Sequence, residues 1–421
     1  MSDVAASPAP ADGVPDGPSA WRVALASLLL ISCGMGIEYL LWSNVKTISD
    51  DMGWSRGTTS AAYALEMLGT GIGGIFMGRL CDRSGAVLVV LIGAMMIPAG
   101  ALVLTHVTEP WQFCLIFGLM IGFLGNATLF APLITTATRW FNRNRGLAVA
   151  VVASGQGIAG AIWPAVFDYL IELYGWRGSL FIYGLFAMVT MPPLVLLLKG
   201  RPPGWSTLEN ERKHARSRGL RFGSLAENVP LALLCAAIAC CCIAMAMPLL
   251  HVASHAQDVG YTRTQGAFLL TWIMALSFIG RLGLGFFADT IGGLRAMLVG
   301  SGLQALGILV MVPFDSLWVL YLGATVFGIG FGGLVPMYAV ALRSIYPPHS
   351  IGWRVGAIFL FGAIGMAVGG QMAGSFFDYA GTYRWAFLVG FGFNVVNLFL
   401  IVAVMIITRG PRRGPATEVF A

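Results

Sequence analysis

The chain has 421 residues, of which 57% are hydrophobic and only 10% are charged, and its formal net charge is +6. So small a polar fraction cannot coat a soluble globule of this length, which excludes a soluble enzyme or binding domain. A lipid bilayer must therefore cover much of the surface.

Apolar stretches of about 20 residues, long enough to cross roughly 30 Å of hydrocarbon as helices, recur along the whole chain. We predict twelve spans, at 22–44, 58–78, 86–105, 112–138, 147–171, 179–198, 230–252, 265–287, 295–313, 317–341, 355–376 and 385–407. The fold class is therefore an all-α membrane protein.

Polar segments divide these spans into two sets of six. Residues 1–20 lack the basic start and apolar core of a signal peptide and predict a disordered cytoplasmic tail. The stretch 199–229 predicts a cytoplasmic linker between an N-terminal bundle, 21–198, and a C-terminal bundle, 230–408. A second cytoplasmic tail is expected at 409–421.

The Lys and Arg residues predict the orientation, because positive charges beside spans are retained in the cytoplasm. With the N-terminus inside, nineteen of them lie on the cytoplasmic side and five outside, and Arg281 lies within a span. We expect a multi-pass protein of the bacterial inner membrane with both termini cytoplasmic. The retention of Lys and Arg on the cytoplasmic side also accounts for the positive net charge. No nucleic-acid partner is therefore expected.

Cofactor and energy-coupling motifs are missing from the sequence. The seven cysteines lack zinc-type spacing with histidines, and we expect neither a metal nor another cofactor. The glycine clusters are not followed by the GK[ST] signature, so ATP-driven transport is not expected. No arrangement of nucleophile, base and orienting group is visible, which predicts that the protein is not an enzyme.

Short motifs repeat between the two halves. Gly78, Asp82 and Gly85 recur as Gly285, Asp289 and Gly292, and the tripeptide Phe-Asp-Tyr at 167–169 recurs at 377–379. Such repeats are typical of transporters whose two bundles rock around a site between them.

Several segments resemble one transporter family. The segment GRLCDRSG at 78–85 resembles the loop between spans two and three of the major facilitator superfamily. GWSRGTTS at 53–60, RWFNRNRGLA at 139–148 and AQDVG at 256–260 resemble its monocarboxylate porter branch and bacterial relatives. The resemblance implies two pseudo-symmetric six-helix bundles and transport by alternating access.

The 78–85 loop is also a candidate cytoplasmic gate. Asp82 beside Arg83, framed by Gly78 and Gly85, can cap a helix N-terminus and pair with basic residues in one transport state. Asp289 would do the same in the second half. The alternative is a turn that only sets topology.

Three ionisable residues lie well inside predicted spans, Glu38, Glu66 and Arg281, and charges at this depth are candidate site residues. A guanidinium matches a carboxylate through two parallel hydrogen bonds. The resemblance implies a span-eight arginine that holds the substrate carboxylate, and Arg281 falls on it. The alternatives for Arg281 are a structural ion pair or a side chain that reaches the cytoplasmic interface.

Proton coupling has two candidates. The resemblance implies an Asp one turn before that arginine and a span-one lysine, whereas this chain has Ser277 and Glu38 in those regions. Because desolvation favours a protonated carboxyl, Glu38 or Glu66 could load and release a proton, and we favour Glu38. Alternatively, one of them neutralises Arg281 or hydrogen-bonds within its own half.

Weaker candidates are Tyr39, Asn126 and His251. Tyr39 and Asn126 could hydrogen-bond the substrate, although both residue types also join helices, and we favour that structural role. His251 and His255 are one turn apart without a third metal ligand, so His251 is expected at an outer gate or the substrate.

These observations predict a proton symporter of a small monocarboxylate, lactate- or pyruvate-like or a hydroxy acid. Its partners would be this anion, a proton and the bilayer, and we expect a monomer. The span 355–376 has no Lys or Arg, so Arg281 would be the one permanent positive charge in the cavity. A single positive charge favours a substrate with a single negative charge. The alternatives are a proton-coupled drug or metabolite exporter and an organic-anion exchanger; the direction of transport stays open.

Overall fold

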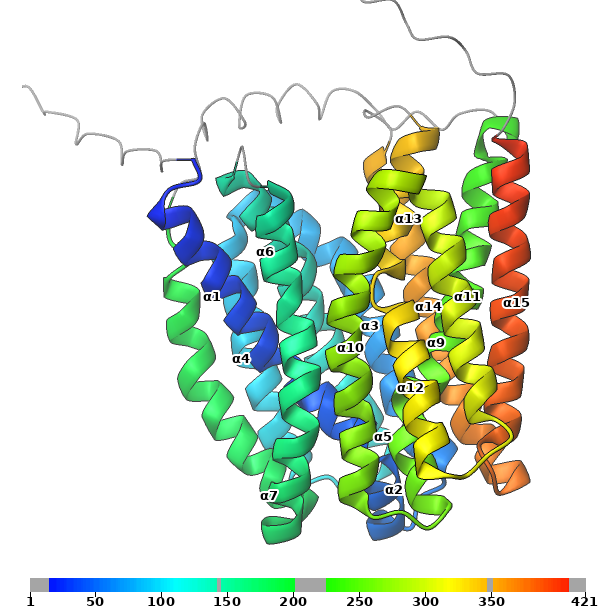
Figure 1. The fold of residues 1–421 in the computed structure, drawn as a ribbon. Coiled ribbons are helices and arrows are strands. Elements are labelled where there is room, and N and C mark those ends of the chain that lie inside the picture. The colour runs from blue at the N-terminus through cyan, green and yellow to red at the C-terminus, as the bar shows by residue number, and fades with distance from the viewer. Residues whose placement is uncertain (1–14, 142–144, 201–224, 347–350, 409–421) are drawn as a thin grey trace, which may run out of the picture. The chain divides into compact units, whose positions relative to one another are not determined.

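The structure, a computed structural model, describes residues 15–141, 145–200, 225–346 and 351–408, and every regular element in these ranges is a helix (Figure 1). The predicted tail 409–421, most of the predicted linker 199–229 and residues 1–14 lie outside the described residues.

The described helices form two compact units. The first contains the described residues of Met1–Leu41 and Leu68–Arg221, and the second contains Trp42–Met67 and the described residues of Phe222–Ala421. The boundary therefore passes through α2 and α3. The predicted bundles at 21–198 and 230–408 stay a prediction.

The first unit is built around α7, in which two helices meet at Gly175. Its elements are α1 (Pro18–Gly34), the start of α2 (Gly36–Met52), the end of α3 (Arg56–Ser84), α4 (Ala86–Leu104), α5 (Pro110–Leu115), η1 (Ile116–Asn126), α6 (Ala127–Trp140) and α7 (Arg145–Leu196). Both α1 and α4 pack along α7.

The helix α7 turns at Gly175, which has a φ of +68°. A side chain is disfavoured at this dihedral, so glycine permits the turn. The turn is held by Arg177, whose guanidinium donates to the carbonyls of Thr105 at 2.6 Å and Val107 at 2.7 Å. The predicted spans 147–171 and 179–198 are thus two helices that meet at this turn.

Among its described residues, the second unit contains seven helices in addition to Trp42–Met67. They are α9 (Leu225–Asp258), α10 (Arg263–Ile291), α11 (Gly293–Met311), α12 (Leu317–Phe331), α13 (Leu334–Ile345), α14 (Ile351–Ala380) and α15 (Arg384–Ile407). Helices α14 and α15 both pack against α9, and α11 packs against α12.

A buried polar network ties α11, α13 and α15 together inside the second unit. The amide nitrogen of Asn397 donates to Ser301 Oγ and to Asn394 Oδ1, each at 3.0 Å, and the Tyr338 hydroxyl donates to Asn397 Oδ1 at 3.0 Å. Because these partners are buried together, each bond avoids the cost of an unpaired polar group.

Ten described stretches are long and apolar enough to cross a membrane. The sequence predicts twelve, and two differences account for the gap. One is that the stretch Val151–Leu196 contains both predicted spans of α7, which meet at Gly175. The other is α3, a helix of 29 residues rich in Gly, Ser and Thr, which lies outside those ten stretches of the described chain.

Three predicted spans are interrupted helices. Span one breaks at Met35 between α1 and α2, and span ten breaks at Gly332 and Gly333 between α12 and α13. Span four contains the π-helical segment η1. Interruptions at membrane depth need their freed backbone groups paired by neighbours, and π-helical turns are frequent at functional sites.

The sequence repeat extends to backbone conformation. Gly85, before α4, has a φ of +84°, and its repeat partner Gly292, before α11, has a φ of +87°. The Gly85 N–H donates to the Cys81 carbonyl and the Gly292 N–H to the Ala288 carbonyl, each at 3.0 Å. The same helix-ending turn therefore occurs in both halves.

Candidate functional site

The predicted carboxylate-binding residue, Arg281, lies on α10 beside the break between α12 and α13. Its Nε donates to the Gly332 carbonyl at 3.0 Å. This approach is close, since a Cβ added at Gly332 would lie 2.0 Å from the Ser277 carbonyl oxygen. The interrupted helix thus supplies the acceptor that holds one edge of the guanidinium.

Ser277, one turn before Arg281, has an internal partner. It is 2% exposed, and its hydroxyl donates to the Met274 carbonyl at 2.7 Å. A serine bonded to its own helix carries no charge and cannot replace the acidic partner that the family resemblance implies at this position.

The two carboxyl candidates are both buried, but in different units. Glu66 lies on α3 in the second unit and is 0% exposed. Glu38 lies in the first turn of α2 in the first unit and is 2% exposed, and its Oε2 has no hydrogen-bond partner among the described residues. A buried, incompletely paired carboxyl is a candidate proton carrier.

Tyr39 and Asn126 also belong to the first unit. The Tyr39 hydroxyl donates to the Gln156 carbonyl at 3.1 Å, which joins α2 to α7. Asn126 is the last residue of η1, where the π-helical segment passes into α6. The tyrosine thus has the helix-joining contact that was the alternative to substrate binding.

His251 is fully buried in the second unit among protein groups. Its Nε2 lies 3.0 Å from the Gly370 carbonyl oxygen and 3.4 Å from Ser60 Oγ. The ring centroid is 4.8 Å from that of Tyr383. Burial raises the pKa of Tyr383 well above its usual value, so this phenol stays neutral at physiological pH.

The side chains of three predicted gate residues, Asp82, Arg83 and Asp289, lie outside the described part of the structure. Their framing glycines are described: Gly78 lies on α3, and Gly85 forms the turn before α4.

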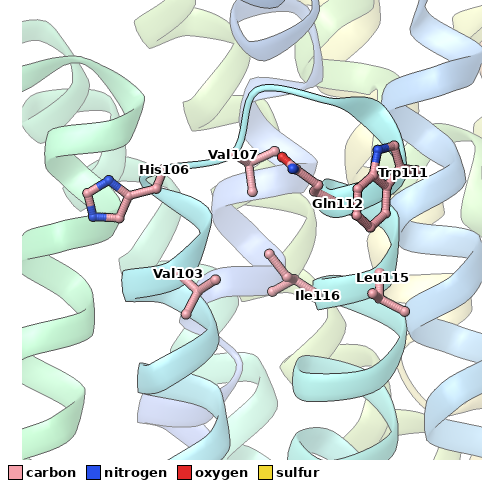
Figure 2. A pocket seen from close by; sticks show the side chains of 7 residues that line it. All are labelled: Val103, His106, Val107, Trp111, Gln112, Leu115 and Ile116. Carbon is pink, nitrogen blue, oxygen red and sulfur yellow. The ribbon is translucent and has the colours of Figure 1, made fainter.

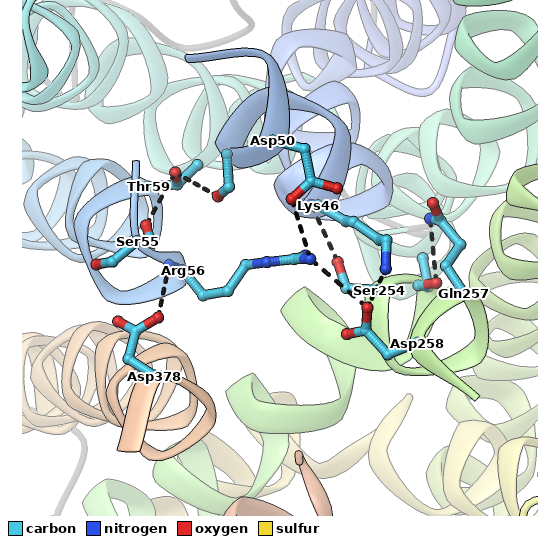
Figure 3. Close-up of polar contacts among 11 residues, drawn as sticks. Lys46, Asp50, Ser55, Arg56, Thr59, Ser254, Gln257, Asp258 and Asp378 are labelled. Carbon is cyan, nitrogen blue, oxygen red and sulfur yellow. Dashed lines mark hydrogen bonds and ion pairs between the residues drawn. The ribbon is translucent and has the colours of Figure 1, made fainter. Parts of the chain in front are cut away.

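A charged cluster in the second unit was not predicted from the sequence (Figure 3). Lys46 of α2 forms an ion pair with Asp258 at the end of α9. Arg56, at the start of α3, lies 3.6 Å from Asp258 and 3.5 Å from Asp50. The single carboxylate of Asp258 therefore pairs with two cations of the segment Trp42–Met67.

The same segment is fixed to α14 by Asp378. Its two carboxylate oxygens accept the backbone N–H groups of Arg56 at 2.8 Å and Gly57 at 2.7 Å, at the N-terminus of α3. The Arg56 guanidinium also lies over the Phe377 ring, 5.1 Å from its centroid. A carboxylate at a helix N-terminus satisfies unpaired donors and opposes the helix dipole.

Three sequence motifs contain residues of this cluster. Arg56 and Asp258 fall within GWSRGTTS and AQDVG, two motifs of the family resemblance, and Asp378 falls within the repeated tripeptide Phe-Asp-Tyr. Nothing in the sequence indicates that Asp258 pairs with Lys46, because the two residues are 212 positions apart.

A separate pocket lies between the end of α4 and the start of the next span (Figure 2). It is lined by Val103, His106, Val107, Trp111, Gln112, Leu115 and Ile116. None of the predicted site residues lines it. The described residues contain no group of three or more His, Cys, Asp or Glu side chains placed to hold a metal ion.

Comparison with known proteins places the chain among membrane transporters. The model of the family described as Major Facilitator Superfamily matches residues 27–250 and 232–420. MFS-type transporter pynF of Aspergillus niger is 26% identical over 394 residues, covering 92% of this chain and 88% of that protein. Monocarboxylate transporter 11 of Homo sapiens is 26% identical over 414 residues, covering 95% and 86%.

Solved structures share the fold. The crystal structure of nucleoside transporter NupG superposes with a TM-score of 0.69 at 14% identity, covering 92% of this chain and 99% of that one. A bacterial homologue of the human lysosomal transporter Spinster gives a TM-score of 0.71 at 15% identity, covering 93% and 98%. At these identities the likeness concerns the fold alone.

Proposed function

Because this chain belongs to the Major Facilitator Superfamily, we propose that it carries a small organic monocarboxylate across the membrane together with a proton. Membership makes it a multi-pass membrane protein and a secondary transporter of small molecules, not an enzyme. Among its relatives, human monocarboxylate transporters 11 and 12 and rat monocarboxylate transporter 13 are 23–26% identical over more than 90% of this chain.

The observation that carries the proposal is the placement of Arg281. It is a cation on a membrane-spanning helix, and its Nε is fixed by the Gly332 carbonyl at a helix break. A guanidinium matches a carboxylate through two parallel hydrogen bonds, and this chemistry is the reason for assigning the substrate anion to Arg281. The absence of Lys and Arg from 355–376 favours a single negative charge on the substrate.

Glu38 is the preferred proton carrier. It is buried, lies next to a helix break, and has one carboxylate oxygen without a partner in the described residues. Breaks of this kind bring backbone dipoles to ions and substrates at membrane depth in other transporters. Glu66, which is also buried, is the second candidate.

Alternating access gives the charged cluster around Arg56 a role as a gate. The segment Trp42–Met67 belongs to the first half by sequence repeat, yet it is held to α9 and α14 by Asp258 and Asp378. A rocking motion of the two halves would break these bonds in one state and form them in the other. We propose that the cluster closes the outer face of the transporter. This is the face opposite the cytoplasm, where both termini are expected.

The experiment that tests the proposal is uptake of labelled lactate, pyruvate and hydroxy acids into proteoliposomes, with and without an inward proton gradient. Arg281→Ala should raise KM by about tenfold to a hundredfold, since a charge-assisted hydrogen bond contributes about 1.5–3 kcal/mol. Arg295→Ala removes an exposed arginine of α11 and serves as the matched control, with uptake unchanged.

Two results would contradict the proposal. If no carboxylate is taken up, or if uptake is indifferent to Arg281, the anion site is wrong. Proton-driven extrusion of bulky cations by the same proteoliposomes would instead assign the chain as an exporter that uses Glu38 or Glu66.

A further inference from the structure

The break between α1 and α2 ends a helix inside the membrane span, where unpaired carbonyls are costly. The last four carbonyls of a helix lack partners within it. At α1 these belong to residues 31–34, and each lies within hydrogen-bond distance of a donor. The Ile31 carbonyl accepts the Met35 N–H at 3.1 Å.

Two aromatic side chains of α7 supply the other bonds. Trp163 Nε1 donates to the Ser32 carbonyl at 2.7 Å. The Tyr183 hydroxyl lies 2.8 Å from the Cys33 carbonyl oxygen and 3.3 Å from that of Gly34. Together the two rings cap the C-terminal end of α1.

The cap is held by packing as well as by hydrogen bonds. The rings of Trp163 and Tyr183 meet edge to face at a centroid distance of 5.1 Å, and Phe167 stacks on Trp163 at 5.2 Å. A Cβ added at Gly36 would lie 2.5 Å from Tyr183 Cε2 and 2.9 Å from Trp163 Cε2. The rings therefore rest directly on the first residue of α2.

Glu38 lies two residues beyond that contact, in the first turn of α2. Tyr39, the next residue, is anchored to the Gln156 carbonyl. The first turn of α2 is thus fixed on both sides of Glu38, whose Oε2 is buried without a hydrogen-bond partner in the described residues.

We propose that Trp163 and Tyr183 are positioning residues that cap the broken first span and thereby hold the Glu38 carboxyl in its place. The inference rests on the proposed function in that Glu38 is the proposed proton carrier. Neither aromatic residue needs to touch the substrate. Their donors fix where α1 ends, and this fixes where α2 begins.

The test is an infrared spectrum of the full chain purified in lipid nanodiscs, which needs no substrate. Subtracting the spectrum of Glu38→Gln isolates the carboxyl band of Glu38. Trp163→Phe and Tyr183→Phe keep a ring and remove the donor, and both should shift this band. Gly36→Ala should shift it as well, because the added Cβ displaces both rings.

Matched controls are Trp111→Phe and Tyr174→Phe, which make the same changes at exposed rings of the first unit and should leave the band in place. If Trp163→Phe does not fold, Tyr183→Phe decides the question, because it removes a single oxygen atom. A band that stays unmoved in a folded Tyr183→Phe protein overturns the proposal, whether or not carboxylates are transported.

Uptake then shows whether the positioning matters for transport. Both variants should lose maximal uptake with little change in substrate KM, as expected for a residue that acts through the proton carrier. Absence of any carboxylate uptake by the wild type would count against the proposed function while leaving the spectroscopic result intact.

Discussion

At the residue scale, the Asp378 side chain both caps the N-terminus of α3 and links α3 to α14. It accepts two backbone N–H groups at the start of α3, and it comes from a helix that lies more than 300 positions further along the chain. Carboxylates that cap helices usually lie next to the helix in sequence. Here a local capping contact is made by a distant part of the chain, so it also joins the two sequence halves.

Replacing Asp378 by Ala should lower the stability of the second unit by about 1 kcal/mol, the typical cost of losing a helix cap. The loss would appear as a lower midpoint in thermal unfolding of the purified protein. Asp315→Ala is the control: it removes an exposed ion pair with Arg384, which contributes little. Equal losses for the two variants would show that the capping bonds add nothing.

The charges around Asp258 show why its substitution is more complex. Its partners, Lys46 and Arg56, come from two different helices, α2 and α3. Removing this carboxylate leaves two cations close together, so the effect of Asp258→Asn would mix a lost attraction with a new repulsion. Asp378 is the cleaner position to test.

At the scale of elements, the interrupted helices are the parts of the fold most closely tied to the candidate site. The α12–α13 break presents the Gly332 carbonyl to Arg281, and the α1–α2 break precedes Glu38. Both breaks contain glycines packed tightly against a neighbouring helix. Small residues at such positions allow close approach, and any side chain there must separate the helices.

Gly332→Ala should therefore weaken the second unit and disturb substrate binding together. The new Cβ would meet the Ser277 backbone carbonyl at 2.0 Å, an overlap that the backbone must relieve at a cost of about 1–3 kcal/mol. We expect a lower unfolding temperature and a higher substrate KM, because the acceptor of Arg281 moves.

The control for this prediction is Gly302→Ala on α11, where an added Cβ meets no atom within 4 Å. That variant should be as stable as the wild type or slightly more stable, since alanine favours a helix over glycine by about 1 kcal/mol. Unchanged KM and stability in Gly332→Ala would show that the helices there have room to separate.

At the scale of the whole molecule, the proposed gate can be locked chemically. A Cβ at Gly57 would lie 3.2 Å from Ser375 Oγ, so side chains at these two positions face each other where α3 meets α14. Gly57→Cys with Ser375→Cys, in a background without the seven native cysteines, should form a cross-link on oxidation. Uptake into proteoliposomes should stop when the link forms and return on reduction.

Each single cysteine variant is the control and should be insensitive to oxidant. Full uptake by a protein shown to be cross-linked would contradict the gate, because the segment Trp42–Met67 could then stay bound to α14 throughout the transport cycle.

Hydropathy was enough to predict the helical class and most spans. The bilayer imposes a length and a composition on every crossing helix, and both can be read locally in the sequence. The repeat glycines Gly85 and Gly292 were also predictable as a matched pair, and their dihedrals agree.

The contacts that organise the candidate site were not predictable in the same way. Trp163 and Tyr183 act on groups more than 100 positions away, and their residue types are common in membrane helices. Glu38 and Arg281 could be predicted as site residues because a charge within a span is rare. The neutral groups proposed to hold them could not be predicted, because only their position in the fold distinguishes them from other residues of the same types.

The packing of Trp42–Met67 against α9 and α14 within the second unit also bears on how the protein is made. A chain is synthesised from its N-terminus, and its domains generally fold in that order. This segment leaves the ribosome about 200 residues before Asp258 and more than 300 before Asp378. During membrane insertion, Lys46 and Arg56 are therefore synthesised before their acidic partners. The hydrogen bonds and ion pairs of the cluster can all form only after α14 has been made.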